Sequence, residues 1–262
     1  MKGISAIESR RIAVLVEHYV DNREKFSTIL YQLNGYLAAS RVLGNLVHSV
    51  KQRTKDPEHL RSKLMRKLLK SKATSEAFEF SKDNFFKRIS DLAGFRIIHL
   101  HTRQAKDIHD ELLAIFNEQR WILVEGPIAK TWDDEYRSYF RTLGWKTEDS
   151  ERMYTSVHYI VQPNSRSELT CEIQVRTLME EVWGEVDHTI NYPVSSTIQS
   201  CREQIKVLAR LTSSCSRLVD SIFLSSVEPH TVAVKSLPAK RSRARKSVAP
   251  QDNSAPPDTG DA

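Results

Sequence analysis

The sequence predicts an α/β protein in which helices flank a mixed β-sheet. Three observations carry this prediction. Apolar residues recur at helical spacing over residues 12–37 and again after residue 177. Residues 94–101 form an apolar run with the length of a buried strand. Residues 153–161 and 168–176 alternate between polar and apolar side chains around a short polar loop, a pattern typical of a β-hairpin.

The first 50 residues are predicted to form a helical segment. One or two helices account for the spacing of its apolar side chains, which are Ile12, Leu15, Tyr19, Phe26, Ile29, Leu33 and Leu37. A further helix is expected to begin near Pro57, because proline suits the first turn of a helix, where its missing N–H leaves no bond unmade.

The middle of the chain alternates between strand and helix patterns. After the strand at residues 94–101, a helix is expected from about residue 103 to 118, and its inward side chains are Ala105, Ile108, Leu112 and Ile115. Residues 120–126 predict the next strand, and the hairpin follows after a long connection.

Two helices are expected to end the folded part. The first begins at Thr177, where Glu180 three residues later matches a capping box, and the second spans about residues 203–224. The inward side chains predicted for the first helix are Met179, Val182, Trp183, Val186 and Ile190. Those predicted for the second are Ile205, Leu208, Cys215, Leu218 and Ile222.

Composition excludes several classes of protein. The 262 residues are 40% hydrophobic, and they contain no apolar run near the roughly 18 residues that a membrane span needs. Charged side chains interrupt the N-terminal apolar stretch, which argues against a secretory signal. Three cysteines are too few for a disulfide framework. We therefore expect a cytoplasmic protein without membrane contact.

The positive charge is unevenly distributed. The chain has 39 basic and 33 acidic side chains, a net charge of +6, which favours polyanionic partners. Residues 227–262 hold six basic and four acidic side chains among Pro, Ser and Ala, without apolar periodicity, so we expect a disordered basic tail there. The folded part is therefore only mildly basic.

One face of the predicted hairpin gathers ionisable groups. Strand alternation places Glu172, Gln174 and Arg176 on the same face, opposite Cys171, Ile173 and Val175. Tyr154 and His158 share a face on the partner strand. If the two polar faces coincide, this surface is either an ordinary wet sheet face or a functional site.

Four blocks of sequence separate these alternatives. In chain order they are Arg53-Thr-Lys55-Asp-Pro57 with Lys63, Asp91-Leu-Ala-Gly-Phe-Arg96, Tyr154-Thr-Ser-Val-His158, and Glu172-Ile-Gln-Val-Arg-Thr177 followed by Trp183 and Asp187-His188. Together they resemble the synthetase domain of RelA/SpoT-type alarmone synthetases. The resemblance places such a domain at residues 51–226. Because the chain has no room for the hydrolase and regulatory domains of long members, it resembles the small, single-domain form.

The resemblance implies a fold, a reaction and a metal. The fold is a nucleotidyltransferase-like mixed sheet. The reaction transfers the β,γ-pyrophosphate of ATP to a ribose 3′-hydroxyl, ordinarily that of GDP or GTP, to make (p)ppGpp. Mg²⁺ would be held by Asp91 and Glu172, and Glu172 would accept or orient the hydroxyl proton. Such chemistry depends on positioning and on neutralising phosphate charge.

The same resemblance assigns the remaining site residues. It implies that ATP is bound by Arg53, Lys55, Lys63 and Arg96. It implies that the acceptor nucleotide is bound by Tyr154, His158, Gln174 and Arg176, and that His158 joins Asp91 and Glu172 as a catalytic residue. Small members of the family often form homo-oligomers, so a second copy of the chain is a candidate partner.

The acceptor side departs from the family pattern. Met153 stands where the family usually has glycine before the stacking tyrosine, which leaves the acceptor open. One alternative is a toxin-like pyrophosphokinase acting on adenosine nucleotides or the 3′ end of tRNA. The non-enzyme alternative is an RNA-binding or regulatory module. The aromatic-rich residues 128–152 are expected to form a partly helical cover over the acceptor site or a packing insertion.

Overall fold

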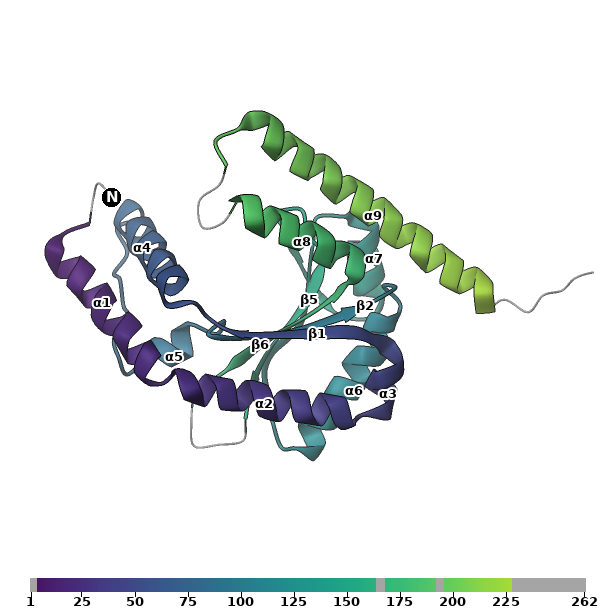
Figure 1. Cartoon of the computed structure of the whole chain (residues 1–262), viewed down its shortest axis with the longest axis horizontal. Coiled ribbons are helices and arrows are strands. Elements are labelled where there is room, and N and C mark those ends of the chain that lie inside the picture. Colours follow the sequence, from purple (N-terminus) through teal and green to yellow (C-terminus); the bar gives the residue numbers. More distant parts are fainter. Residues whose placement is uncertain (1–3, 164–167, 192–195, 228–262) are drawn as a thin grey trace, which may run out of the picture. The chain divides into compact units, whose positions relative to one another are not determined.

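The computed structural model describes residues 4–163, 168–191 and 196–227, and within these ranges it forms a six-stranded mixed sheet (Figure 1). The strand order is β1-β2-β6-β5-β3-β4. Two neighbouring pairs, β2 with β6 and β3 with β4, are parallel, and the others are antiparallel. The strands are β1 (Val47–Thr54), β2 (Ala93–His99), β3 (Ile122–Thr131), β4 (Lys146–Asp149), β5 (Ser156–Gln162) and β6 (Cys171–Thr177). The predicted fold class is confirmed.

Helices precede and follow the strands in the chain. They are α1 (Ala6–Asp21), α2 (Arg23–Ala39), α3 (Arg41–Leu46), α4 (Pro57–Ala73), α5 (Phe85–Arg88), α6 (Gln104–Glu118), α7 (Asp134–Thr142), α8 (Leu178–Asn191) and α9 (Gln199–Val227). Helix α4 begins at Pro57 as predicted, and the Asp56 side chain caps it by accepting the N–H groups of Glu58 and His59. Within the described ranges, no helix is both long and apolar enough to cross a bilayer.

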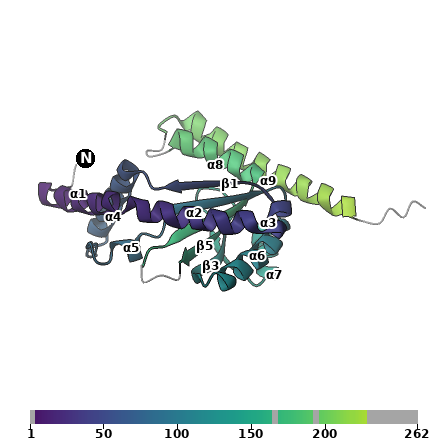
Figure 2. The ribbon, with the colours of Figure 1, turned by 60° about the horizontal axis from the view of Figure 1, so that its bottom comes forward.

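The two faces of the sheet have different surroundings (Figure 2). Helices α2 and α6 lie against one face, and α8 and α9 lie on the other. The first face belongs to the main core, in which Phe95, Ile173 and Tyr159 pack with residues of α1, α2, α4 and α6. Because strands alternate, the residues between these core positions point to the α8 side. The N-terminal helices therefore share one core with the sheet.

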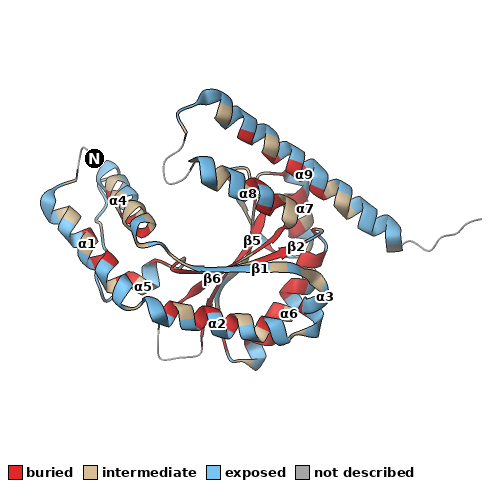
Figure 3. Ribbon diagram, viewed as in Figure 1, coloured by how far each residue is buried: buried red, intermediate tan, exposed pale blue. Residues whose placement is uncertain are grey.

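Two polar strands, β1 and β4, were not predicted from the sequence. Strand β1 is an edge strand with mostly exposed side chains, shown in pale blue in Figure 3, so it lacks the apolar signal of a buried strand. Strand β4 has only four residues. Between β3 and β4, helix α7 buries Tyr136 and Phe140 in the main core, and Trp145 stacks on Phe140. Helix α7 in residues 128–152 therefore packs into the core, which agrees with the packing alternative, while the expected role of this segment as a cover over the acceptor site stays a prediction.

The predicted inward face of α8 is partly wrong. Trp183 is buried, but Val182, Val186 and Ile190 are 39–48% exposed. Glu180 and Glu181 are buried in their place, because the sheet beneath α8 presents hydrogen-bond donors and cations. Thr177 does cap the Glu180 N–H, but the Glu180 carboxylate accepts from the Thr155 N–H, so the capping box is only half formed.

Helix α9 also turns an unexpected face to the sheet. Ile205 is buried as predicted, whereas Leu218 and Ile222 are 62% and 57% exposed and Cys215 is exposed. Small side chains replace them at the interface: Ala209, Thr212, Ser213 and Ser216. Ser213 and Arg217 both bond to Asp133, so polar contacts hold this helix where apolar packing was expected. Apart from Val227, the predicted disordered tail lies outside the described residues.

Candidate functional site

A pocket of about 440 Å³ opens on the α8 side of the sheet. Its size falls within the range of small-molecule sites, about 300–1,000 Å³. Segments from β1, β2, β6 and α8 and the turn before β2 meet around it. The lining residues are Lys51, Gln52, Arg53, Asp91, Gly94, Phe95, Arg96, Glu172, Gln174, Glu185 and His188. Five of the residues assigned from sequence therefore meet here: Arg53, Asp91, Arg96, Glu172 and Gln174.

Asp91 lies in the turn between α5 and β2. Its two carboxylate oxygens accept from Lys63 Nζ at 2.7 Å and Lys55 Nζ at 3.1 Å. Burial raises the pKa of Asp91, but the ammonium groups of Lys63 and Lys55 outweigh burial and hold the pKa below its ordinary value. Lys55 and Lys63 thus contact the Asp91 carboxylate but do not line the pocket themselves.

Glu172 is hydrogen-bonded from two sides. Its Oε1 lies 3.1 Å from Nδ1 of His158 on β5, and its Oε2 accepts from Gln174 Nε2 at 3.0 Å. Burial raises the pKa of Glu172, but the contacts with His158 and Gln174 outweigh it and keep the pKa below the ordinary value. The polar faces of β5 and β6 therefore coincide, as expected if this face is functional.

Helix α8 places two carboxylates over the strands. Glu181 pairs with Lys51 of β1 at 2.8 Å, Arg96 of β2 at 3.1 Å and Arg176 of β6 at 3.3 Å. Glu185, one turn later, pairs with Arg96 at 2.7 Å. Burial lowers the pKa of Arg176 to about 10, so it remains protonated at neutral pH. Arg176 lies outside the pocket lining.

Arg53 differs from the other cations of the pocket. Its exposed side chain crosses Gly94, the neighbouring residue on β2. Among the described residues it has no recorded ion pair or hydrogen bond, whereas Lys51 and Arg96 are held by Glu181 and Glu185. Its charge is therefore available to a bound anion.

Tyr154 and His158 lie beyond Glu172, outside the pocket lining. The Tyr154 ring stacks on Trp183 of α8, with centroids 6.4 Å apart and an angle of 24°. Its centroid lies 6.1 Å from that of His158. Met153 before it has a φ of 61°, a left-handed conformation that favours glycine. The chain thus keeps a glycine-type backbone where the sequence lacks the glycine.

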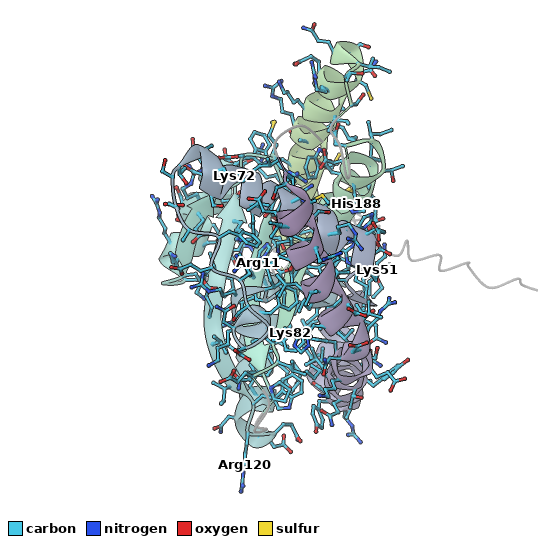
Figure 4. The ribbon with its side chains drawn as sticks, turned by 90° about the vertical axis from the view of Figure 1, so that its left-hand side faces the viewer. Arg11, Lys51, Lys72, Lys82, Arg120 and His188 are labelled. Carbon is cyan, nitrogen blue, oxygen red and sulfur yellow. The ribbon has the colours of Figure 1, made fainter. Side chains whose placement is uncertain are left out.

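Four polar or charged pocket residues were missed by sequence reasoning: Lys51, Gln52, Glu185 and His188. The first two lie on the unpredicted strand β1. The sequence had marked Asp187-His188 only as part of a block, without a role for His188. Lys51 and His188 lie on the same side of the molecule (Figure 4). Burial, with a contribution from Arg53, lowers the pKa of His188, so its ring is neutral at pH 7.

Two of the three carboxylates that line the pocket, Asp91 and Glu172, are oxygen ligands of the kind that Mg²⁺ takes. Asp91 and Glu172 line the same pocket and interact electrostatically. Mg²⁺ at nucleotide sites takes one or two carboxylates and completes its octahedron with phosphates and water. Across the described ranges, no three His, Cys, Asp or Glu side chains are grouped to hold a metal. The protein alone therefore offers an incomplete set that a nucleotide's phosphates would complete.

Comparisons with known proteins bear on the family and the fold. The model of the family described as "Region found in RelA / SpoT proteins" matches residues 52–197, more than half of the chain. Among curated proteins, no sequence matches.

Solved structures share the fold at low sequence identity. A GTP pyrophosphokinase family protein from Streptococcus pneumoniae is 16% identical with a TM-score of 0.57, covering 80% of this chain and 93% of that one. The small alarmone synthetase 1 from Bacillus subtilis is 16% identical with a TM-score of 0.54, covering 80% and 96%. The same Bacillus subtilis protein bound to its product pppGpp is 17% identical with a TM-score of 0.53 and the same coverage.

Proposed function

This chain belongs to the RelA/SpoT family, and from that premise we propose that it is a nucleotide 3′-pyrophosphokinase. It transfers the β,γ-pyrophosphate of ATP to the ribose 3′-hydroxyl of GDP or GTP and so makes (p)ppGpp. The observation that carries the proposal is the presence of Asp91 and Glu172 in one pocket of nucleotide size, beside Arg53, which forms no ion pair with any of the described residues. The relative from Bacillus subtilis, solved with pppGpp and with AMPCPP, supports the choice of nucleotides.

ATP is proposed to lie over β1 and β2. Arg53 supplies a cation for stacking on the base or pairing with phosphate, and Arg guanidinium suits both roles. The neutral ring of His188 lies at the same pocket and adds a planar surface. Lys55 and Lys63 hold Asp91 and bring two positive charges next to the phosphates.

The acceptor is proposed to lie toward β5, with its base against Tyr154. Its 3′-oxygen forms a bond to the β-phosphorus of ATP as the bond from that phosphorus to the α-phosphate oxygen breaks. AMP leaves with the bonding electrons, and the hydroxyl proton passes to Glu172. In a loose transition state that proton moves late, so the carboxylate acts chiefly by orientation. An ionised carboxylate fixed by His158 and Gln174 is suited to orienting the hydroxyl.

Magnesium enters the proposal through the same two carboxylates. Asp91 and Glu172 would hold it, and it would neutralise phosphate charge as the pyrophosphate moves. Asp91 must then exchange some of its contact with Lys55 and Lys63 for the ion. The low pKa of Asp91 keeps it ionised for this purpose at neutral pH.

The test is transfer of label from γ-labelled ATP in the presence of Mg²⁺. Purified protein is incubated with GDP, GTP, unlabelled ATP or deacylated tRNA, and labelled products and AMP are separated by chromatography. We expect labelled guanosine 3′-pyrophosphates and one AMP per transfer. Label found only on an adenosine nucleotide or on tRNA would overturn the guanosine assignment in favour of the toxin-like alternative. No transfer to any acceptor would overturn the enzyme assignment.

A further inference from the structure

Two side chains on β6, Arg176 and Gln174, connect the buried carboxylate of Glu181 to Glu172. On β6, Arg176 Nη2 donates to Gln174 Oε1 at 2.7 Å, and Gln174 Nε2 donates to Glu172 Oε2 at 3.0 Å. Glu172 in turn meets His158 at 3.1 Å. Residues 172, 174 and 176 form this row because alternate residues of a strand share one face. Glu181 stands at the far end, where it pairs with Arg176.

The chemistry of arginine fixes the direction of this row. A guanidinium has only donors, so the Gln174 group that faces Arg176 must be the carbonyl oxygen. The amide nitrogen of Gln174 then necessarily faces Glu172 and donates to it. Without Arg176 beside it, the Gln174 side-chain amide can rotate by half a turn. Its oxygen would then face the Glu172 carboxylate, and the two acceptors would repel each other. Arg176 therefore decides which atom Glu172 meets.

Arg176 in turn depends on Glu181. The Arg176 side chain is 7% exposed, and the neighbouring guanidinium of Arg96 repels it. Glu181, itself 5% exposed, lies between these two cations and pairs with both. A buried charge that loses its partner is strongly unfavourable. Without Glu181, the Arg176 side chain would therefore be more stable in another conformation that exposes its charge to solvent.

The backbone of α8 confirms how closely this helix covers Arg176. A Cβ atom at Gly184 would lie 2.7 Å from Arg176 Nη1, a distance shorter than real Cβ contacts. Glycine at this position lets the helix approach until Glu181 reaches all three strands. The close approach of α8 to β6 thus leaves room for the Arg176 guanidinium and for no side chain at position 184.

We infer that Glu181 is a positioning residue for the reaction, acting on Glu172 through Arg176 and Gln174. The inference rests on the proposed function, in which Glu172 orients the attacking hydroxyl. Glu181 touches no reacting atom. Its removal frees the Gln174 amide and withdraws one of the two hydrogen-bond contacts that orient the Glu172 carboxylate.

The experiment uses Glu181→Gln, which keeps the side-chain shape and removes the charge. We expect kcat to fall about tenfold or more, as for other supporting residues, with KM for both nucleotides changed less than about threefold. Glu181→Asp keeps the charge and restores most of kcat. Glu203→Gln, an exposed change on α9, leaves kcat unchanged.

A second readout does not need activity. Labelling glutamine side chains with ¹⁵N allows the Gln174 amide to be observed by NMR, and its signal is assigned by its loss in Gln174→Met. In the unaltered protein the amide N–H donates to Glu172 and is protected from exchange with solvent, so we expect this N–H to exchange faster in Glu181→Gln. Unchanged protection in the folded variant would overturn the inference even if the chain is an active pyrophosphokinase. A loss of protection without any transferase activity would overturn only the proposed function.

A further variant covers loss of folding. If Glu181→Gln fails to fold, Arg176→Met carries the test, because methionine keeps much of the side-chain length but offers no donor to the Gln174 carbonyl. The same faster exchange of the Gln174 amide N–H is expected. Protection in Arg176→Met that matches the unaltered protein would contradict the role of the row.

Discussion

His158 Nδ1 lies 3.1 Å from Glu172 Oε1, across the antiparallel pair of β5 and β6. In the register, His158 is directly opposite Gln174, so its ring reaches diagonally to Glu172. Because the ionised Glu172 carboxylate can only accept, Nδ1 is the donor in this contact. Gly126, with a φ of 112°, passes so close to the His158 carbonyl that a Cβ would lie 2.6 Å from it. The backbone of β3 thus helps to fix this pair.

The buried carboxyl of Glu180 gives the protein a specific dependence on pH. Burial raises the pKa of Glu180 to about 7, and the contact with the Thr155 N–H only partly offsets burial. The native protein keeps this proton up to about pH 7, while the unfolded chain loses it near the ordinary value of 4.5. The free energy of unfolding therefore falls as pH rises between these values, by roughly 3 kcal/mol from this group.

Glu180→Gln should remove this decrease in the free energy of unfolding. We would measure denaturant unfolding of the unaltered protein and of the variant at pH 5 and pH 8, because the contributions of all other titrating groups cancel in the difference between the two proteins. We expect the unaltered protein to lose roughly 3 kcal/mol relative to the variant between these pH values. Equal pH dependence in the two proteins would show that Glu180 titrates normally. Glu203→Gln, which changes an exposed carboxyl, serves as the matched control.

Two glycines in helices should respond oppositely to alanine. Gly184→Ala places a Cβ 2.7 Å from the buried Arg176 guanidinium, and we expect about 1–3 kcal/mol of destabilisation from overpacking. Gly35→Ala, within α2, meets nothing within 4 Å and should stabilise by about 0.5–1 kcal/mol through helix propensity. Thermal and denaturant unfolding measure both. Stabilisation of equal size at the two positions would mean that α8 does not lie tightly over Arg176.

Donor and acceptor binding should separate by residue. Arg53→Ala removes a cation from the main pocket, so we expect KM for ATP to rise about tenfold while KM for the acceptor changes little. Tyr154→Leu removes a stacking surface worth about 1–3 kcal/mol, so KM for the acceptor should rise while that for ATP holds. Steady-state kinetics with each nucleotide varied in turn measure the split. If Arg53→Ala raised KM for the acceptor and Tyr154→Leu raised KM for ATP, the two binding sites would have been assigned the wrong way round. If each variant raised both KM values, the two sites would not be separate.

The sequence predicted the parts of the site that depend on strand alternation. Residues 172–176 were correctly divided into a core face and a polar face, because period-two patterning is fixed by backbone geometry. Pro57 correctly marked the start of α4. The meeting of Asp91 with Glu172 was implied only by the family resemblance, since they lie on segments far apart in the chain. Local pattern carries no information on which parallel strands become neighbours.

The sequence failed where polar groups were buried. On α8, helical spacing placed Val182, Val186 and Ile190 inward, but Glu180 and Glu181 are buried because they find partners across the sheet. Such partners become visible only once the strands are assembled. Strand β1 was missed because an exposed edge strand needs no apolar periodicity. Lys51 was missed because it lies on β1, and His188 was missed because the inward face of α8 was predicted incorrectly.

The central claim is that Asp91 and Glu172 form one pyrophosphate-transfer site. The most direct test measures label transfer from γ-labelled ATP to GDP or GTP by the unaltered protein, Asp91→Asn and Glu172→Gln, with folding checked by circular dichroism. We predict transfer by the unaltered protein and a loss of at least about a thousandfold in each variant, because both carboxylates act in the transition state. Undiminished transfer in either folded variant would contradict the account.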